Sequence, residues 1–264
     1  MKIIAKLLFF LLIFFIAASA VTNCTVEPVP SGENPYSGNK LIIDNQQVWT
    51  RNRQAKKISQ AYLKYGGNHG ITVFVFVAEN DLFNNENALA KPVGSGSITN
   101  GILNIDQFSL KENEHLLDWK RAGNDHFRSF FSNYWHDTDI NDSTVKGNMI
   151  LLEALTGNVP FGLLDRQRIY GTETSITCEV VLYIYVNKDC TITGNASEGY
   201  IQGQYYYYTD GNLNLKLKKG INMVCRKETY TTDFSGSAVI SMEIREPIQN
   251  PENFKWVIEP DFIY

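Results

Sequence analysis

Histidine is the side chain best suited to acid–base chemistry near neutral pH, and the chain contains four: His69, His115, His126 and His136. The last three each stand beside an acidic residue in the sequence. Adjacent side chains on a helix or a strand point in different directions, so these pairs do not form catalytic dyads. We therefore expect the histidines to be surface residues.

A calcium loop is suggested by Asp137, Asp139 and Asn141, which have the alternating oxygen ligands of an EF-hand. The sixth position of such a loop needs glycine and the twelfth needs glutamate, but Asp142 and Asn148 stand there. An EF-hand is therefore not predicted. A calcium site of another kind stays an alternative, and we expect no metal or other cofactor.

Three cysteines follow in the second half of the chain, Cys178, Cys190 and Cys225. Their spacing matches no zinc-binding pattern. Because they are odd in number, at most one disulfide can form among them. Cys178 and Cys225 fall on the apolar faces of expected strands, which indicates small buried side chains.

Other catalytic motifs are missing from the sequence. No serine stands in a nucleophile elbow, no glycine-rich loop precedes an expected helix, and no His-Glu-x-x-His occurs. Two carboxylates that are distant in sequence and meet in space would still permit a secreted hydrolase. We favour a protein that is not an enzyme and keep the hydrolase as the weaker alternative.

The N-terminus has the pattern of an export signal. Lys2 and Lys6 give a positive start, residues 7–18 are an unbroken apolar run, and small residues follow at 18–20. From Leu7 to Val21 the segment is about 15 residues long, shorter than the roughly 20 that a membrane-spanning helix needs. We therefore expect the segment to be cleaved and the mature protein to be exported.

Two cleavage sites compete. Cleavage after Ala20 would release a secreted chain that begins at Val21. Alternatively, residues 21–24 form a relaxed lipobox in which Cys24 receives a diacylglyceryl group. Residues 24–39 are rich in proline and glycine and predict an extended tether, which favours lipidation. We thus expect a signal peptide at 1–23 and a lipid anchor that holds the protein to a membrane of the cell envelope.

Composition indicates a β-rich globular protein. Without the signal about 240 residues remain, enough for one large or two modest domains. The 14 tyrosines and 15 phenylalanines favour strands over a helical bundle. The net charge of -4 argues against nucleic acid as a partner.

In the first half of the chain, residues 71–78 are apolar on both faces, as in a strand that is covered on both sides. Asn100 and Gly101 fit a type I′ turn, which would pair Thr99 with Ile102 in a hairpin.

Helical signals are confined to a short part of this half. Residues 127–134 have aromatic side chains at helical spacing and predict a short amphipathic helix. A further helical turn is expected around 116–119. Residues 147–157 fit either a helix or a buried strand.

From about residue 175 the sequence alternates as strands do. Hairpin turns are expected at 210–211 and at 218–220, the second ending on a left-handed glycine, so that strands 200–208, 213–217 and 221–226 form a meander.

The expected fold is mainly β, with two antiparallel β-sandwich-like modules. The first module spans residues 40–165 and contains the short helices, and the second spans residues 170–264. The boundary between them is expected near Pro160 to Gly171.

A candidate ligand site follows from the expected register. Tyr205 would point outward opposite Lys216, and Tyr207 would point outward opposite Asn214. Exposed aromatic rings beside amide and ammonium groups can stack on sugars and bind their hydroxyls. The alternative is that these tyrosines only cover the sheet or pack on the other module.

Five segments of the sequence carry a family resemblance: residues 58–80, 94–103, 182–194, 213–224 and 254–258. They include a Tyr-Gly turn before an apolar strand and a late Leu-Lys-Lys-Gly phrase, and a loose lipobox precedes them. Together they resemble the uncharacterised, duplicated lipoproteins of spirochaetes such as treponemes. Ile221 and Cys190 depart from the tryptophan and valine expected there. The resemblance implies a cell-envelope location and a β-rich architecture, and it carries over no catalytic residue.

The sequence thus predicts an exported, lipid-anchored protein that is not an enzyme and presents a β-rich surface for interaction or adhesion. Its expected partners are a membrane, through the anchor, and a glycan or another surface protein. A carbohydrate-binding module is the alternative.

Overall fold

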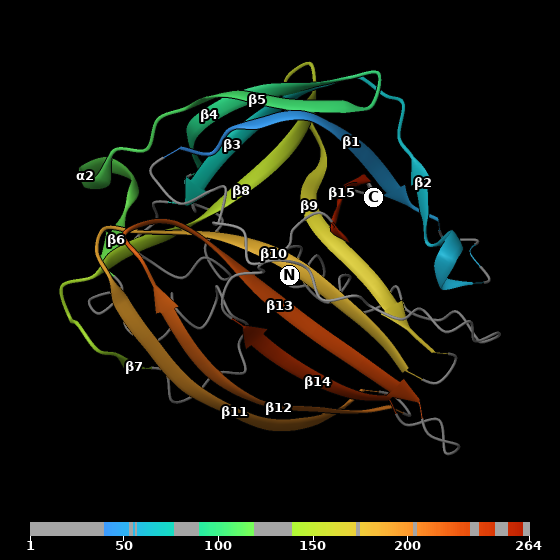
Figure 1. Ribbon diagram of the computed structural model, residues 1–264, viewed down its shortest axis with the longest axis vertical. Helices are drawn as coiled ribbons and strands as arrows, with labels where there is room; N and C mark the ends of the chain where they lie inside the picture. Colours follow the sequence, from blue (N-terminus) through green and yellow to red (C-terminus); the bar gives the residue numbers. More distant parts are fainter. Residues whose placement is uncertain are drawn as a thin grey trace.

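The computed structural model describes residues 40–52, 55, 57–76, 90–118, 139–172, 175–202, 205–232, 238–245 and 253–260. The export signal, the tether with Cys24 and the helix expected at 127–134 lie outside these residues. In the described part nearly all regular structure is β-strand, which confirms the β-rich fold (Figure 1).

Two short helical elements accompany the strands in these residues, a 3-10 turn η1 (Ile58–Gln60) and helix α2 (Glu112–His115). The first eight strands are β1 (Ile43–Arg51), β2 (Tyr62–Lys64), β3 (His69–Phe76), β4 (Ala90–Thr99), β5 (Ile102–Phe108), β6 (Leu117–Asp118), β7 (Asp139–Ile140) and β8 (Lys146–Thr156). They are followed by β9 (Val159–Gly171), β10 (Ser175–Val186), β11 (Cys190–Gln202), β12 (Tyr205–Leu217), β13 (Gly220–Thr232), β14 (Ala238–Arg245) and β15 (Lys255–Pro260).

Two uncertain segments of the sequence are resolved by these bounds. Residues 147–157, which fitted a helix or a strand, lie almost wholly in β8, whose side chains alternate between buried and half-buried. The helical turn expected around 116–119 is wrong, because α2 ends at His115 and Leu117 and Asp118 pair with β8.

Seven strands form a closed ring. Neighbours pair in the order β8, β3, β4, β5, β1, β15 and β9, and β9 pairs back onto β8. All of these pairings are antiparallel except that of β1 with β15, which is parallel. The first and last strands of the described chain are therefore neighbours, more than 200 residues apart in sequence.

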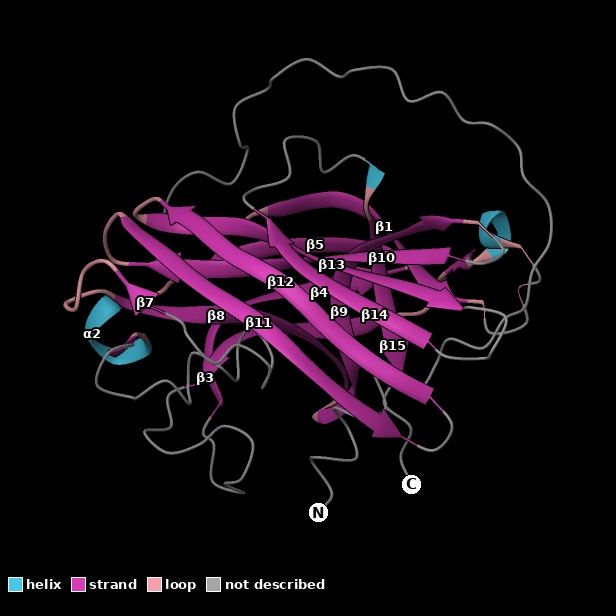
Figure 2. Cartoon of the chain, turned by 90° about the horizontal axis from the view of Figure 1, so that it is seen from below, coloured by secondary structure: helices cyan, strands magenta, loops and turns pink. Residues whose placement is uncertain are grey.

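The sheet branches at β10. The first half of β10 pairs with the end of β9, and its second half pairs with the start of β8. From β10 the sheet continues through β13, β14, β12, β11 and β7. Figure 2 shows β11, β12 and β14 side by side, in agreement with their pairing.

The expected division into two modules is not confirmed. Residues 160–171, where a boundary was expected, lie inside strand β9. This strand pairs with β8 and β15 in the ring and with β10 beyond it. The described strands therefore belong to one continuous sheet.

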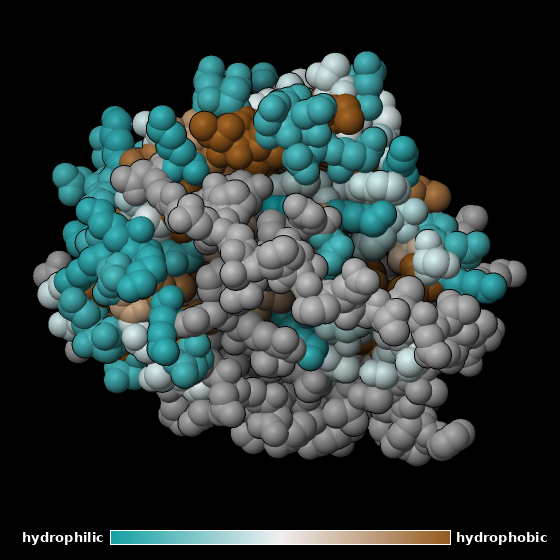
Figure 3. All heavy atoms as spheres, in the orientation of Figure 1, coloured by the Kyte–Doolittle hydropathy of each residue, from teal (hydrophilic) through white to brown (hydrophobic). Residues whose placement is uncertain are grey.

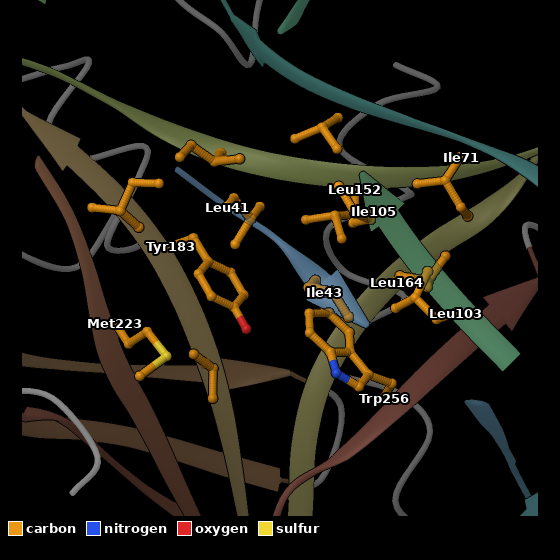
Figure 4. Packing of buried hydrophobic residues seen from close by; sticks show 14 of the residues in the cluster. Leu41, Ile43, Ile71, Leu103, Ile105, Leu152, Leu164, Tyr183, Met223 and Trp256 are labelled. Atoms are coloured by element: carbon orange, nitrogen blue, oxygen red, sulfur yellow. The ribbon is translucent and has the colours of Figure 1, made fainter. Parts of the chain in front are cut away.

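Two hydrophobic cores lie on the two faces of β10. The larger core lies between the inward faces of the ring strands and one face of β10 and β13, and it includes Trp256, Leu103 and Tyr183 (Figure 4). The smaller core includes Ile184 of β10 and Leu215 of β12. Odd-numbered residues of β10 face the first core and even-numbered residues face the second, so the strand is buried on both sides.

The hairpin between β4 and β5 is confirmed. Thr99 pairs with Ile102, and Asn100 and Gly101 both have positive φ, 51° and 77°, as a type I′ turn requires. A β-carbon on Gly101 would lie 1.8 Å from the backbone oxygen of Tyr65. The turn is therefore packed closely against the segment that leads into β3.

We expect Gly101→Ala to destabilise the protein, because alanine would be strained at this φ and would collide with backbone. The free energy of unfolding should fall by about 1–3 kcal/mol. Urea unfolding measures the loss, and Gly157→Ala is the matched control. Gly157 also has positive φ in a turn, but no atom lies within 4 Å of its added β-carbon, so its loss should be smaller.

The hairpin expected at Asp210 and Gly211 is wrong. Strand β12 runs without interruption through both residues, which pair with Ser197 and Ala196 of β11. The whole of β12 pairs with β11, so the chain reverses between Gln202 and Tyr205 instead. One long ladder satisfies more backbone groups than two short strands, which overrides the local turn preference of Asp-Gly.

The hairpin expected at 218–220 is also wrong, although the left-handed conformation predicted for Gly220 is confirmed. Gly220 has a φ of 103°, as predicted for a left-handed position. The strands on either side do not pair with each other, because β14 lies between β12 and β13 in the sheet. Residues 218–220 therefore link two strands that are separated by a third.

Candidate functional site

The structure separates the residues of the predicted sugar site. Tyr205 and Tyr207 pair with Gln202 and Tyr200 of β11, and not with Lys216 and Asn214. The tyrosine side chains lie outside the described part of the structure. Asn214 and Lys216 are exposed on the same strand, alternating with the buried side chains of the smaller core. The predicted cross-strand juxtaposition is therefore wrong, and sugar binding by these residues stays a prediction.

The histidines differ from the expected surface residues. His115 is buried, and its Nδ1 accepts a hydrogen bond of 2.9 Å from the backbone N–H of Lys111. His69 is half-buried and stacks on Phe161, with ring centroids 4.0 Å apart. Its two ring nitrogens contact Tyr65 Oη and Thr156 Oγ1. His126 and His136 lie outside the described residues.

The burial predicted for Cys178 and Cys225 is confirmed. Cys178, Cys190 and Cys225 are buried free thiols. Asp142 and Asn141 of the calcium-like segment make contacts within the protein, to Lys188 and to the backbone of Thr191. Among the described residues, no three His, Cys, Asp or Glu side chains gather as a metal site would require.

Surface ion pairs gather at the end of the molecule that holds α2, β6 and β7. Asp142 pairs with Lys188, and Asp189 pairs with Lys218. Figure 3 shows this end as largely hydrophilic. Exposed pairs of this kind contribute little to stability and bring no unusual chemistry.

A group of polar and aromatic side chains lies on the face of the ring that points away from the large core. Inward residues of β15, such as Trp256 and Ile258, alternate with outward ones. The register of β1, β2, β9 and β15 places the outward residues of these strands on one face. We call this group the outer polar cluster; its members are Trp49, Arg51, Tyr62, Asp165, Gln167, Lys255 and Glu259.

Arg51 forms the centre of the outer polar cluster. Its Nε donates to Glu259 Oε1 at 3.1 Å, and its Nη2 donates to Gln167 Oε1. Gln167 Nε2 also donates to Glu259 Oε1 at 3.4 Å, and Arg51 Nη2 lies 3.7 Å from the Sγ of Cys178. The Glu259 carboxylate is thus held by two donors, which suits a positioning role better than proton transfer.

Asp165 is the second carboxylate of the outer polar cluster. Burial, reinforced by the negative charge of Glu259, raises its pKa to about 6. Arg226 and Arg51 oppose this shift, since a nearby positive charge favours the ionised form. Asp165 is two positions from Leu163, which pairs with Glu259, so the two carboxylates are diagonal neighbours on the sheet.

Lys255 lies over the aromatic rings of the outer polar cluster. Its Nζ is 3.5 Å from the centroid of the Trp49 ring and 5.4 Å from that of Tyr62. Both rings are half-buried, as is Lys255, and burial lowers the pKa of this lysine. Burial also raises the pKa of Tyr62, whose hydroxyl oxygen has no hydrogen-bond partner in the described part of the protein.

The inward face of β9 carries charge as well, and there it contacts side chains of neighbouring strands. Arg168 pairs with the buried carboxylate of Glu179, which also accepts a bond of 3.0 Å from Tyr170 Oη. Arg166 lies over the ring of Trp256. These contacts join β9 to β10 and β15, and we assign them to the stability of the fold.

Sequence alternation alone would have found part of the outer polar cluster. Phe254, Trp256 and Ile258 are apolar and alternate with Lys255 and Glu259, so a strand here places the two charged residues on the opposite face. No local pattern predicted that β1 would lie beside β15, which brings Trp49 to Lys255.

In the described residues, no helix is both long enough and apolar enough to cross a membrane. No protein-family model, curated protein or solved structure matches this chain. The resemblance to spirochaete lipoproteins therefore stays a prediction.

Proposed function

We propose that this protein is exported, anchored to the cell envelope through a lipid on Cys24, and acts as a binding protein that is not an enzyme. The observation that carries the proposal is the N-terminal sequence, with its two lysines, short apolar run and lipobox-like residues 21–24. The first described strand begins at Ile43, and the proline- and glycine-rich sequence of residues 24–39 suits a spacer between anchor and fold.

The fold supports a binding role. One continuous sheet with a core on each face of β10 is a rigid support for an exposed surface, and the proposal does not need two separate sandwich modules.

Mass spectrometry of the mature N-terminus tests the anchor. We expect the first residue to be Cys24 carrying a diacylglyceryl group, and the protein to sediment with membranes. At about 0.8 kcal/mol per buried methylene, two acyl chains hold a protein firmly in a bilayer.

Cys24→Ala provides the control for this measurement. The variant should lose the acyl mass and leave the membrane fraction, because nothing then inserts into the bilayer. A wild-type chain that begins at Val21 without modification would refute the anchor, and an intact leader on a cytosolic protein would refute export altogether.

A further inference from the structure

Helix α2 is held in place by three hydrogen bonds that meet at His115. The backbone N–H of His115 donates to the carbonyl oxygen of Lys111 at 2.9 Å, which closes the turn. In the reverse direction, the backbone N–H of Lys111 donates to His115 Nδ1 at 2.9 Å. Asn148 of β8 is buried and donates to the carbonyl oxygen of His115 at 2.8 Å. His115 therefore joins the turn to itself and to the ring.

The bond from Lys111 fixes the protonation state of the His115 ring. A backbone N–H can only donate, so Nδ1 must accept and the proton of the neutral imidazole must lie on Nε2. In the charged imidazolium both ring nitrogens carry a proton, and Nδ1 can no longer accept. Two donors would then face each other at 2.9 Å. The closed turn is therefore compatible only with neutral His115.

The charged groups around His115 do not reverse this preference. Glu114 favours the charged form, whereas Lys91 of β4 and Lys111 oppose it. Burial is the largest effect, and the pKa of His115 is lowered from its ordinary value of 6.5. Glu114 Oε1 is also shared with Lys111 Nζ, 3.2 Å away. From β8 the contacting side chain is Asn148, which does not titrate.

Apolar side chains of the larger core lie beneath α2. Leu110 and Leu116, on either side of the helix, are half-buried and pack against this core. Glu112 of α2 accepts a hydrogen bond of 3.1 Å from the hydroxyl of Tyr185, a core residue that is 2% exposed. Figure 1 shows α2 at the end of the ring where β6 lies. The helix thus covers one end of the larger core.

We propose that α2 is a pH-dependent cap on the larger core: protonation of His115 releases the turn and uncovers the apolar side chains beneath it. Residues 110–116 take part in no strand pairing of the described ring, so the turn can open while the ring stays intact. This inference depends neither on export nor on the lipid anchor.

The direction of the pH effect follows from the two states of the turn. In the open turn the imidazole is hydrated and takes its ordinary pKa of about 6.5, whereas its pKa in the closed turn is lower. The open turn therefore binds more protons than the closed one. Opening becomes easier as the pH falls below about 6.5, and the effect levels off below the pKa of the closed turn.

Amide hydrogen exchange of the purified protein at pH 7.5 and pH 5.0, corrected for the intrinsic exchange rates, tests the proposal. The protection of the Lys111 amide should fall about five- to tenfold at pH 5.0, because each unit by which the pKa is lowered is worth a factor of ten. Amides in the middle of β8 should keep their protection. A fluorescent dye that binds exposed apolar surface should brighten at pH 5.0.

His115→Asn separates titration from fold. The asparagine oxygen can take the place of Nδ1 as acceptor but does not ionise. Whether this variant holds the turn more or less firmly at pH 7.5, its opening should be the same at both pH values. His69→Asn is the matched control, because it removes the half-buried histidine of β3 and leaves α2 unchanged. It should respond to pH as the wild type does.

Four outcomes would overturn the inference. They are equal protection of the Lys111 amide at both pH values in the wild type, a pH response that persists in His115→Asn, a response that is lost in His69→Asn, and a loss of protection that extends equally to β8. The last would mean that acid unfolds the ring as a whole and not the cap alone.

Discussion

Trp256→Ala should lower the free energy of unfolding by about 3–5 kcal/mol, the loss typical of removing a large aromatic side chain from a core. Trp256 is 2% exposed and lies in the larger core. Its ring stacks on that of Tyr183 of β10, with centroids 6.0 Å apart and planes 2° apart. The residue thus connects the last strand of the ring to the strand that leads out of it, and its removal leaves a cavity where both meet.

Urea unfolding of two further variants makes this prediction specific. Trp256→Phe should cost much less than Trp256→Ala, since it keeps an aromatic ring and the indole N–H has no hydrogen-bond partner in the described residues. Trp49→Ala removes the same side chain from the half-buried outer face of the neighbouring strand, and should also cost less. Equal losses for Trp49→Ala and Trp256→Ala would contradict the assignment of inner and outer faces.

Local features of this fold could be predicted from the sequence because they depend on few residues. The Asn100-Gly101 turn needs positive φ at both positions, which few other residue pairs tolerate, and its register followed directly. The strand expected at 71–78 was recognised by its apolar residues on both faces, and its described part, 71–76, lies in β3. The burial of Cys178 and Cys225 followed from alternation in the same way.

The order of the strands could not be predicted, because it depends on contacts between distant residues. Asp210-Gly211 has the same turn chemistry as Asn100-Gly101, yet β12 passes straight through it. What differs is the neighbouring strand: β11 offers pairing partners along the entire length of β12. A turn signal is weak when a long ladder competes with it, and sequence periodicity does not reveal the competing strand.

The outer polar cluster could be predicted only in part for the same reason. Alternation indicates that Lys255 and Glu259 share a face, but the parallel pairing of β15 with β1 is a contact between the two ends of the described chain. The register predicted for Tyr205 and Tyr207 was wrong for the same reason, since it also depended on which strands pair.

Asp165→Asn should stabilise the protein at pH 7 and have little effect at pH 4. The pKa of Asp165 is raised to about 6 in the folded state by burial and by Glu259, from an ordinary value of 3.8. Between these two pH values the folded state binds more protons than the unfolded state, so this carboxyl makes stability fall as pH rises from about 4 to about 6. Asparagine does not ionise, and the variant therefore avoids that loss.

The expected gain at pH 7 is about 1–3 kcal/mol, since each pKa unit corresponds to 1.36 kcal/mol and Asp165 is partly accessible to water. Urea unfolding at the two pH values measures it, with Asp106→Asn as the control because Asp106 is exposed on β5. Destabilisation by Asp165→Asn at pH 7 would contradict the prediction, because it would mean that Arg226 and Arg51 stabilise the ionised carboxylate by more than burial and Glu259 destabilise it. The sign of this change in stability therefore decides which effect on the ionised Asp165 is larger: the attraction of Arg226 and Arg51, or the cost of burial beside Glu259.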